Sequence, residues 1–314
     1  MAYPVNAVVF PGQGSQYLSM LEDYFIHEPV FKEVFETASK ILDIDLINLI
    51  KSNSEENISK TEITQPLMLV ANVALWKLVS PYLRNVSYLS GHSLGEYAAL
   101  VASDALKFEN ALDLVKTRSK LMQNAVPEKE GAIAAVIGLT EEQVTNICHN
   151  ISLDLSKLVN TANINSSNQI VISGTSQGVE KAITQCKQMG AKRAIKLKMS
   201  VPAHSELMLP ASKKFTKTIE QVNFYDPHIP VIHNVDISIS KSSKDIKNKL
   251  ITQIYKPVRW FETIKLMTQD LGVTNIIECG PSKVLTGLIK RINPKVSTID
   301  LDNYENYLKI KNAI

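Results

Sequence analysis

Short apolar runs rich in β-favouring residues recur along the chain, and each is followed by a turn signal. The clearest runs lie at residues 7–10, 86–89, 231–232 and 275–279. Between them, residues 66–83 and 94–103 carry apolar side chains at helical spacing. Strands that alternate with helices in this way are typical of an α/β fold with a mainly parallel sheet.

The stretch from residue 131 to residue 199 has a different pattern. Strand-like runs lie at 132–139, 158–163, 169–174 and 193–199, and helical stretches lie at 140–150 and 177–189. Thr140-Glu141-Glu142-Gln143 is a capping signal for the first helix, and Gly190 stands where the second helix should end. The resulting order, β-α-β-β-α-β, is the ferredoxin-like arrangement.

Together the two patterns predict an α/β protein with one domain inserted into another. We expect a large hydrolase-like domain with a mainly parallel sheet, formed by residues 1–127 and 199–314, and a small ferredoxin-like domain formed by residues 128–198. The length of 314 residues fits two domains at roughly 150 residues each. The ligand site is expected in the cleft between them.

The composition, 45% hydrophobic and 21% charged, excludes disordered and collagen-like chains. No apolar run approaches the ~18 residues of a membrane-spanning helix, and the N-terminus lacks the pattern of a signal peptide, so we expect a cytoplasmic protein without membrane contact. Cys148, Cys186 and Cys279 lie far apart and form no metal-binding spacing. They are interpreted as buried small side chains, and no metal site is expected.

The net charge of +3 is too small to indicate a surface built for nucleic acid. Two stretches are nevertheless strongly basic. The first contains Lys181, Lys187, Lys192, Arg193, Lys196 and Lys198, and the second contains Lys241, Lys244, Lys247, Lys249, Lys256 and Arg259. Each is either an ordinary solvated face or a docking surface for an acidic partner, and charge alone does not decide between the two.

Gly91-His92-Ser93-Leu94-Gly95 has the G-x-S-x-G form and lies directly between a predicted strand and a predicted helix. In this context the two glycines permit a sharp turn that exposes the serine hydroxyl at a helix N-terminus. Ser93 is therefore a candidate nucleophile, and the alternative is a serine that only shapes the turn.

A serine nucleophile requires a general base. The chain contains six histidines: His27, His92, His149, His204, His228 and His233. His27 and His149 lie in polar surroundings, His228 lies in a proline-rich loop, and His233 ends a strand at a position that could face the cleft. His204 follows the last strand of the small domain, where the chain returns across the cleft. Spacing favours His204 without excluding the others.

The loop Pro11-Gly12-Gln13-Gly14-Ser15-Gln16 also follows a predicted strand. It is too short for a dinucleotide-binding loop and has no lysine for a phosphate-binding loop. Its glycines would let the N–H of Gln13 point at a substrate oxygen and form an oxyanion hole with the N–H of Leu94. The alternative is an ordinary glycine turn.

Seven motifs, in order and with matching spacing, resemble those of the malonyl-CoA:acyl carrier protein transacylases. This family includes the fatty-acid synthesis enzyme and the free-standing, trans-acting acyltransferases of polyketide synthases. The motifs are residues 10–16 (FPGQGSQ), 91–96 (GHSLGE), 117–122 (TRSKLM), 163–166 (NINS), 201–204 (VPAH), 253–260 (QIYKPVRW) and 278–281 (ECGP). The resemblance runs nearly end to end.

The resemblance implies a role for each matching residue. Ser93 matches the nucleophile that carries the malonyl ester, and His204 matches its base. Gln253 matches the residue whose main-chain carbonyl orients that histidine, and Arg118 matches the arginine that holds the malonate carboxylate, for which a planar guanidinium fork is suited. Asn165 and Gln13 match polar residues that line the site.

Three positions depart from the family pattern. Tyr17-Leu18-Ser19-Met20 stands where a glycine usually precedes the methionine, and Ala132-Ile133 stands where a methionine is commoner. His233 replaces a smaller polar residue, and no catalytic role is expected for it.

The implied activity is transfer of a malonyl group from malonyl-CoA to an acidic acyl carrier protein by a ping-pong mechanism, with no metal or redox cofactor. One alternative is an acyl hydrolase of the same fold that releases free acid, and another is a carrier-binding scaffold without catalysis. Presence of Ser93, His204 and Arg118 argues against the scaffold. The pathway, fatty acid or polyketide, stays open, and a monomer is expected.

Overall fold

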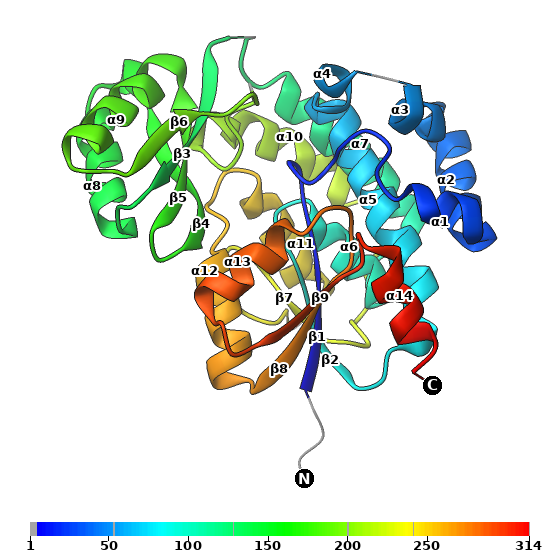
Figure 1. The fold of residues 1–314 in the computed structure, drawn as a ribbon. Helices are drawn as coiled ribbons and strands as arrows, with labels where there is room; N and C mark the ends of the chain where they lie inside the picture. Colours follow the sequence, from blue (N-terminus) through cyan, green and yellow to red (C-terminus); the bar gives the residue numbers. More distant parts are fainter. Residues whose placement is uncertain (1–4, 53, 128, 200, 241, 314) are drawn as a thin grey trace.

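The computed structural model describes residues 5–52, 54–127, 129–199, 201–240 and 242–313. Within these residues the chain forms a five-stranded sheet and a separate four-stranded sheet (Figure 1). Residue 128, where the small domain is predicted to begin, and Lys241 of the second basic stretch lie outside the described residues.

The larger sheet is parallel throughout and has the strand order β7-β2-β1-β8-β9. Its strands are β1 (Val5–Phe10), β2 (Val86–Gly91), β7 (Val231–Ile232), β8 (Val273–Glu278) and β9 (Ser297–Asp300). The four predicted strands are confirmed, whereas β9 was not predicted. Along β1, Val8 and Phe10 enter one apolar core and Ala7 and Val9 enter another. Because both faces are buried, the strand reads as a continuous apolar run.

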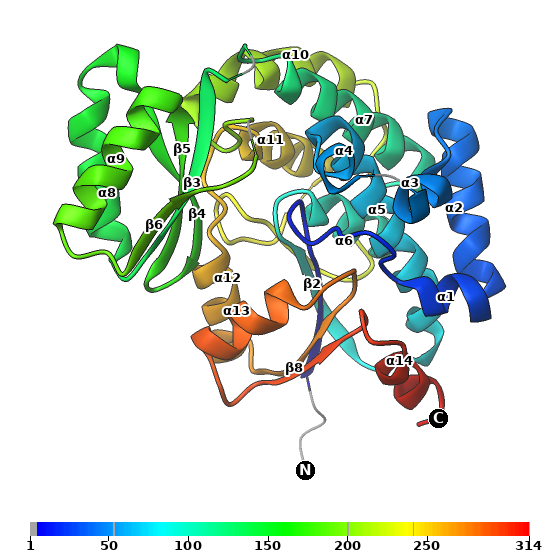
Figure 2. The ribbon, with the colours of Figure 1, turned by 45° about the horizontal axis from the view of Figure 1, so that its top comes forward.

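Helices cover both faces of this sheet (Figure 2). They are α1 (Glu22–His27), α2 (Pro29–Leu42), α3 (Leu46–Ser52), α4 (Glu55–Ile58), α5 (Thr61–Val79), α6 (Gly95–Ala102), α7 (Phe108–Gln123), α10 (Leu209–Ile219), α11 (Ser243–Gln253), α12 (Trp260–Lys265), α13 (Val284–Ile292) and α14 (Tyr304–Lys311). Shorter helical turns lie at Ser80–Tyr82, Leu155–Lys157, Glu206–Met208 and Leu266–Asp270. The two apolar cores of the larger sheet show which helices lie on which face. Helices α2, α5, α6 and α7 pack on one face, and α12 and α13 pack on the other.

Helix α5 differs in two ways from the sequence prediction. It begins at Thr61 rather than residue 66 and continues through Pro66, because burial of nearly the whole helix outweighs the one backbone hydrogen bond that proline removes. With the turn that follows it, the helix is also long and apolar enough to cross a membrane by length and composition, contrary to expectation. Of that apolar window, 78% is buried inside the fold, as in a core helix.

The smaller sheet has the predicted ferredoxin-like order. Its elements are β3 (Gly131–Ile137), α8 (Glu141–Ser152), β4 (Val159–Ser166), β5 (Gln169–Thr175), α9 (Ser176–Gln188) and β6 (Arg193–Lys196). The strands pair antiparallel as β4-β5-β3-β6, and α8 and α9 share one apolar core with one face of the sheet. The capping box between Thr140 and Gln143 is present. Strand β6 ends earlier than predicted, at Lys196.

Candidate active site

Ser93 lies on a sharp turn between β2 and α6 and has a positive φ of 52°. The two glycines of the motif make this turn possible. A Cβ on Gly91 would lie 1.9 Å from the carbonyl carbon of Gly95, and a Cβ on Gly95 would lie 2.0 Å from the carbonyl oxygen of Phe10. The turn therefore presses against β1 and holds the serine hydroxyl at the carboxyl end of the sheet, facing a cavity.

His204 is the histidine that meets Ser93. Its Nε2 lies 2.7 Å from the Ser93 Oγ, and its Nδ1 lies 2.7 Å from the Gln253 carbonyl oxygen and 3.2 Å from that of Lys256. Because a carbonyl oxygen can only accept, Nδ1 carries the ring proton and Nε2 is free to accept the serine proton. Burial, and then the nearby Arg118 cation, lower the pKa of His204 to about 3, so the ring is neutral at physiological pH.

The other five histidines form no hydrogen bond with the Ser93 hydroxyl. His27, His149 and His228 are exposed. His233 is fully buried, does not line the cavity, and contacts Glu96 instead. His92 lines the cavity beside Ser93, but its Nε2 lies 2.9 Å from the Asn165 Oδ1, and burial lowers its pKa.

Arg118 projects from α7 and is 1% exposed. One terminal nitrogen donates to the Gln65 Oε1 at 2.6 Å, and the other donates to the Gln253 Oε1 at 2.9 Å and lies 3.4 Å from the Ser93 Oγ. Among the described residues no carboxylate forms an ion pair with it, and its Nε has no partner. Burial lowers its pKa. A buried cation with only neutral partners is suited to binding an anion beside the nucleophile.

The two expected oxyanion-hole donors, the N–H groups of Gln13 and Leu94, belong to two loops that pack closely together. The loop after β1 passes so close to the nucleophile turn that a Cβ on Gly12 would lie 2.4 Å from the His92 carbonyl oxygen and 3.5 Å from the Leu94 nitrogen. Within the described part of the chain, neither the Gln13 N–H nor the Leu94 N–H donates to a protein acceptor. The Gln13 side chain contacts Thr61, with its Nε2 3.1 Å from the Thr61 Oγ1.

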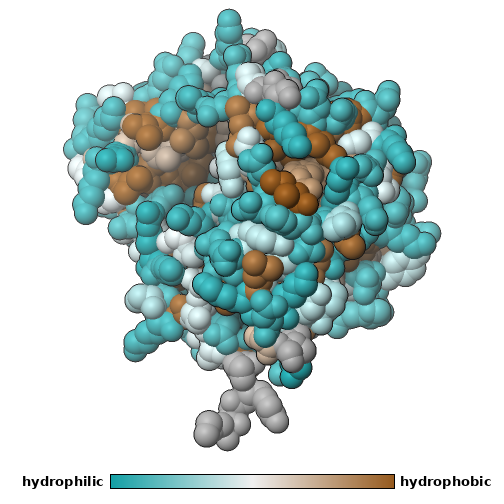
Figure 3. Space-filling view, turned by 45° about the vertical axis from the view of Figure 1, so that its right-hand side comes forward, coloured by the Kyte–Doolittle hydropathy of each residue, from teal (hydrophilic) through white to brown (hydrophobic). Residues whose placement is uncertain are grey.

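These groups line a cavity of about 430 Å³ between the two sheets. Asn165 and Gln13 both line it, as expected for polar residues of the site. The small sheet supplies an apolar wall that includes Ile133, Val171 and Leu197, and hydrophobic surface gathers on that side of the molecule (Figure 3). The atypical segment 17–20 does not line the cavity, whereas Ile133, in the second atypical position, does.

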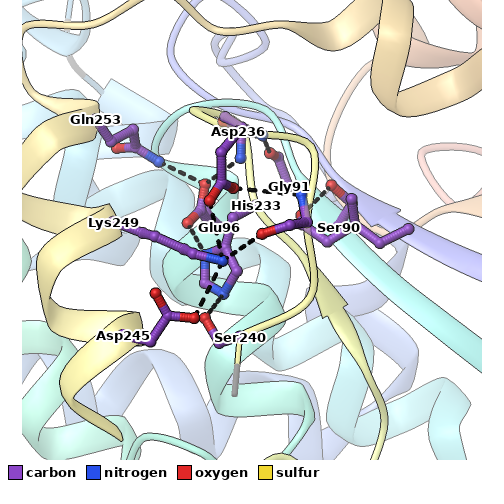
Figure 4. Close-up of polar contacts among 12 residues, drawn as sticks. Ser90, Gly91, Glu96, His233, Asp236, Ser240, Asp245, Lys249 and Gln253 are labelled. Atoms are coloured by element: carbon purple, nitrogen blue, oxygen red, sulfur yellow. Dashed lines mark hydrogen bonds and ion pairs between the residues drawn. The ribbon is translucent and has the colours of Figure 1, made fainter. Parts of the chain in front are cut away.

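Sequence reasoning missed three buried polar residues that hold the site together. Gln65 binds Arg118, and Asn234 accepts the Ser93 N–H through its Oδ1 at 2.7 Å. The Glu96 carboxylate accepts from the Gln253 side chain, as Figure 4 shows. Gln65 and Glu96 each stand in or beside an apolar helical run. A polar side chain at a core position is the signal that could have identified them, because such a group must find hydrogen-bond partners.

The two basic stretches differ in what their side chains do. Lys198 lines the cavity, and the first stretch is mostly exposed. In the second stretch Lys249 is buried and paired with Asp236 and Asp245, and Arg259 is paired with Glu262. The interpretation of the second stretch as a docking face is therefore wrong for the buried Lys249, whereas the Arg259 side chain stays 42% exposed. The three cysteines are free and buried, as expected.

Comparison with known proteins places these features in context. The acyl transferase domain family matches residues 7–298. The malonyl CoA-acyl carrier protein transacylase of Haemophilus influenzae is 43% identical over 304 residues, which is 96% of each chain. The transacylase structure from Coxiella burnetii superposes with a TM-score of 0.95 at 42% identity, covering 99% of each chain. A malonyl-transacylase in complex with its type II PKS acyl-carrier protein has a TM-score of 0.95 at 41% identity, covering 99% of this chain and 100% of that chain.

Proposed function

Because this chain belongs to the acyl transferase family over residues 7–298, with malonyl CoA-acyl carrier protein transacylases as full-length relatives, we propose that it transfers malonyl groups from malonyl-CoA to an acyl carrier protein. The observation that carries this proposal is the buried Arg118 guanidinium, which lies 3.4 Å from the hydroxyl of Ser93 and pairs with no carboxylate among the described residues. A malonyl thioester presents a carbonyl for Ser93 and a carboxylate for Arg118 in one small molecule.

In the first half-reaction the Ser93 hydroxyl proton moves to the His204 Nε2 as the Oγ attacks the thioester carbonyl. The resulting oxyanion accepts hydrogen bonds from the N–H groups of Gln13 and Leu94, each worth roughly 2.7–4 kcal/mol of transition-state stabilisation. The carbon–sulfur bond then breaks, and the CoA sulfur takes the proton from His204, so that CoA leaves as a thiol. The product is a malonyl ester on Ser93.

The second half-reaction uses the same groups in reverse. His204 accepts the proton of the carrier's phosphopantetheine thiol, the sulfur attacks the ester carbonyl, and the Ser93 oxygen leaves with the proton. A base with the Nδ1 proton held by two carbonyl oxygens serves both halves without a triad carboxylate, since the tautomer is already fixed. We propose that no metal or redox cofactor takes part.

The rival within the same fold is an acyl hydrolase, in which water rather than a thiol attacks the malonyl ester. Arg118 argues against it, because a hydrolase that edits carriers gains nothing from a clamp for a malonate carboxylate. Radiolabelled malonyl-CoA incubated with the enzyme and holo-carrier protein tests the choice. Label on the carrier supports transfer, whereas label found only in free malonate would overturn the proposal. Apo-carrier, which lacks the thiol, is the matched control.

The carrier that docks here is proposed to be acidic. The lysines and arginine of the first basic stretch are exposed, and one of them, Lys198, lines the cavity. The relatives include enzymes named for acyl carrier proteins and one in complex with a type II PKS carrier. Transfer assays with carriers of fatty acid and polyketide pathways, run side by side, would assign the pathway. We further propose a cytoplasmic monomer.

A further inference from the structure

One fully buried carboxylate near the nucleophile turn does not line the cavity and has no part in the proposed reaction. Glu96 is 1% exposed, in α6 just after the nucleophile turn. Its Oε2 accepts from the Gln253 Nε2 at 2.8 Å and from the Asn234 N–H at 3.2 Å, and its Oε1 contacts the Nδ1 of His233. Figure 4 shows these groups converging on Glu96 from α6, α11 and the loop after β7.

Gln253 connects Glu96 to both halves of the site. Its backbone carbonyl fixes the His204 ring, and its side-chain oxygen accepts from Arg118. Its Nε2 donates to Glu96 and, at 3.0 Å, to the Ser93 carbonyl oxygen. A rotation of this side chain would therefore disturb the guanidinium and the nucleophile turn at once. The Glu96 carboxylate is one of the two acceptors that hold the amide nitrogen and so set which way the amide points.

Asn234 connects the same carboxylate to the nucleophile. The Asn234 Oδ1 accepts the Ser93 N–H at 2.7 Å, and its Nδ2 donates to the Gly91 carbonyl oxygen at 2.7 Å. These two bonds hold the turn on which Ser93 has its positive φ. Asn234 is itself held by Glu96 through its backbone N–H.

His233 completes this arrangement. It is fully buried, with its Nδ1 on Glu96 and its Nε2 2.6 Å from the Ser240 Oγ. Because a carboxylate oxygen accepts, Nδ1 carries the proton. Within the described residues no lysine or arginine pairs with Glu96, so His233 is the side chain that holds the carboxylate's second oxygen. Lys249, nearby, is occupied by Asp236, Asp245 and Ser238.

We propose that the Glu96–His233 pair is a positioning element of this enzyme: it touches no substrate but orients Gln253 and Asn234, and through them His204, Arg118 and Ser93. The inference rests on the proposed function for the identity of the acyl group, but not for the reactivity of Ser93. If the pair only stabilised the fold, its hydrogen-bond geometry would not matter once the protein was folded.

Two substitutions that carry the same amide group on side chains of different length separate these possibilities. In His233→Asn the side-chain nitrogen falls close to the position of Nδ1, so the contact with Glu96 is kept and that with Ser240 is lost. In His233→Gln the amide falls close to Nε2, so the contact with Ser240 is kept and that with Glu96 is lost. His233→Ser, whose hydroxyl is too short to reach Glu96, is a second variant with the broken contact. All are compared as folded protein, verified by circular dichroism.

The first measurement is the rate at which phenylmethanesulfonyl fluoride sulfonylates Ser93, which reports the Ser93–His204 pair without assuming any acyl substrate. The second is the rate of enzyme acylation by malonyl-CoA and by acetyl-CoA. The sulfonylation and acylation rates of His233→Asn are expected to lie within a few-fold of those of the unsubstituted enzyme. His233→Gln and His233→Ser are expected to lose about 10- to 100-fold in sulfonylation, the range for a small misplacement of reacting groups, and to lose malonyl preference because Arg118 loosens.

The positioning role would be overturned if His233→Asn had the same sulfonylation rate as a folded variant that lacks the Glu96 contact, His233→Gln or His233→Ser. This holds whether both rates are high or both are low. Failure of the proposed function would look different. In that case the unsubstituted enzyme would react with the sulfonyl fluoride but would form no malonyl ester, and the contrast among the His233 variants in sulfonylation would still decide the role of the pair.

Discussion

Substitution of Arg118 by alanine is expected to remove malonyl transfer while sparing acetyl transfer. The guanidinium is buried, donates to neutral oxygens of Gln65, Gln253 and Ser93, and lies over the ring of Tyr97. Hydrogen bonds to a charged group contribute about 1.5–3 kcal/mol each, so a two-bond fork contributes about 3–6 kcal/mol to the malonyl transition state. The incoming carboxylate must compete with Gln65 and Gln253 for the N–H groups of Arg118. The contribution is therefore expected at the lower end of this range.

At about 1.4 kcal/mol per tenfold, the lower value corresponds to a loss of about 100-fold in kcat/KM for malonyl-CoA. Arg118→Lys keeps the charge but not the two-bond fork, so its kcat/KM for malonyl-CoA should fall between those of the unsubstituted enzyme and Arg118→Ala. Acetyl-CoA has no carboxylate and is the matched substrate control, expected to change by only a few-fold. Rates of acyl-enzyme formation in rapid-quench experiments give both values.

The same substitution has a second signature. The Arg118 cation is one of the causes that lower the pKa of His204, after burial. Without it the pKa of His204 should rise toward its usual value, and the acid limb of the acetyl-transfer profile should move to higher pH. Equal losses for malonyl- and acetyl-CoA, with no shift of the acid limb, would refute both the carboxylate clamp and the electrostatic coupling.

Three further outcomes follow from the geometry. Ser93→Ala should abolish acyl-enzyme formation as measured by intact-protein mass, and turnover at the original rate would exclude the ester mechanism. Because the neutral base is the active form and the pKa of His204 is lowered to about 3, acylation should stay flat as pH falls from 8 to about 5, whereas a pH profile falling near the ordinary histidine pKa of about 6.5 would contradict this. Gly91→Ala should lower the free energy of unfolding by at least about 3 kcal/mol because its Cβ would overlap Gly95, while Gly287→Ala, helical and with nothing within 4 Å, should be neutral or stabilising in the same urea titration.

Much of the fold could be predicted from local pattern. The continuous apolar runs predicted the strands of the parallel sheet because both faces are covered, and the capping box at Thr140 predicted where α8 begins. The errors lie where tertiary burial outweighs local preference. Helix α5 passes through Pro66, and β9, short and half-buried, has no apolar run to reveal it.

The candidate site divides in the same way. Ser93 stood out because G-x-S-x-G between strand and helix needs its glycines in an order that the sequence displays. His204 lies 111 residues away, so spacing could only favour it, and the family resemblance was needed to choose it. Glu96 and Asn234 were missed because each becomes meaningful only through a partner on another element.

The sequence by itself determined the two-part α/β architecture, the nucleophile turn and the set of groups able to perform acyl transfer, because periodicity, caps and glycine positions are local properties. Only the tertiary structure decided that two carbonyl oxygens hold the His204 ring, that Arg118 is buried and pairs with no carboxylate among the described residues, and that His233 holds Glu96 rather than facing the cavity. Those outcomes depend on long-range packing, which brings α6, α7, α11 and the strand ends to one place and removes water from between them.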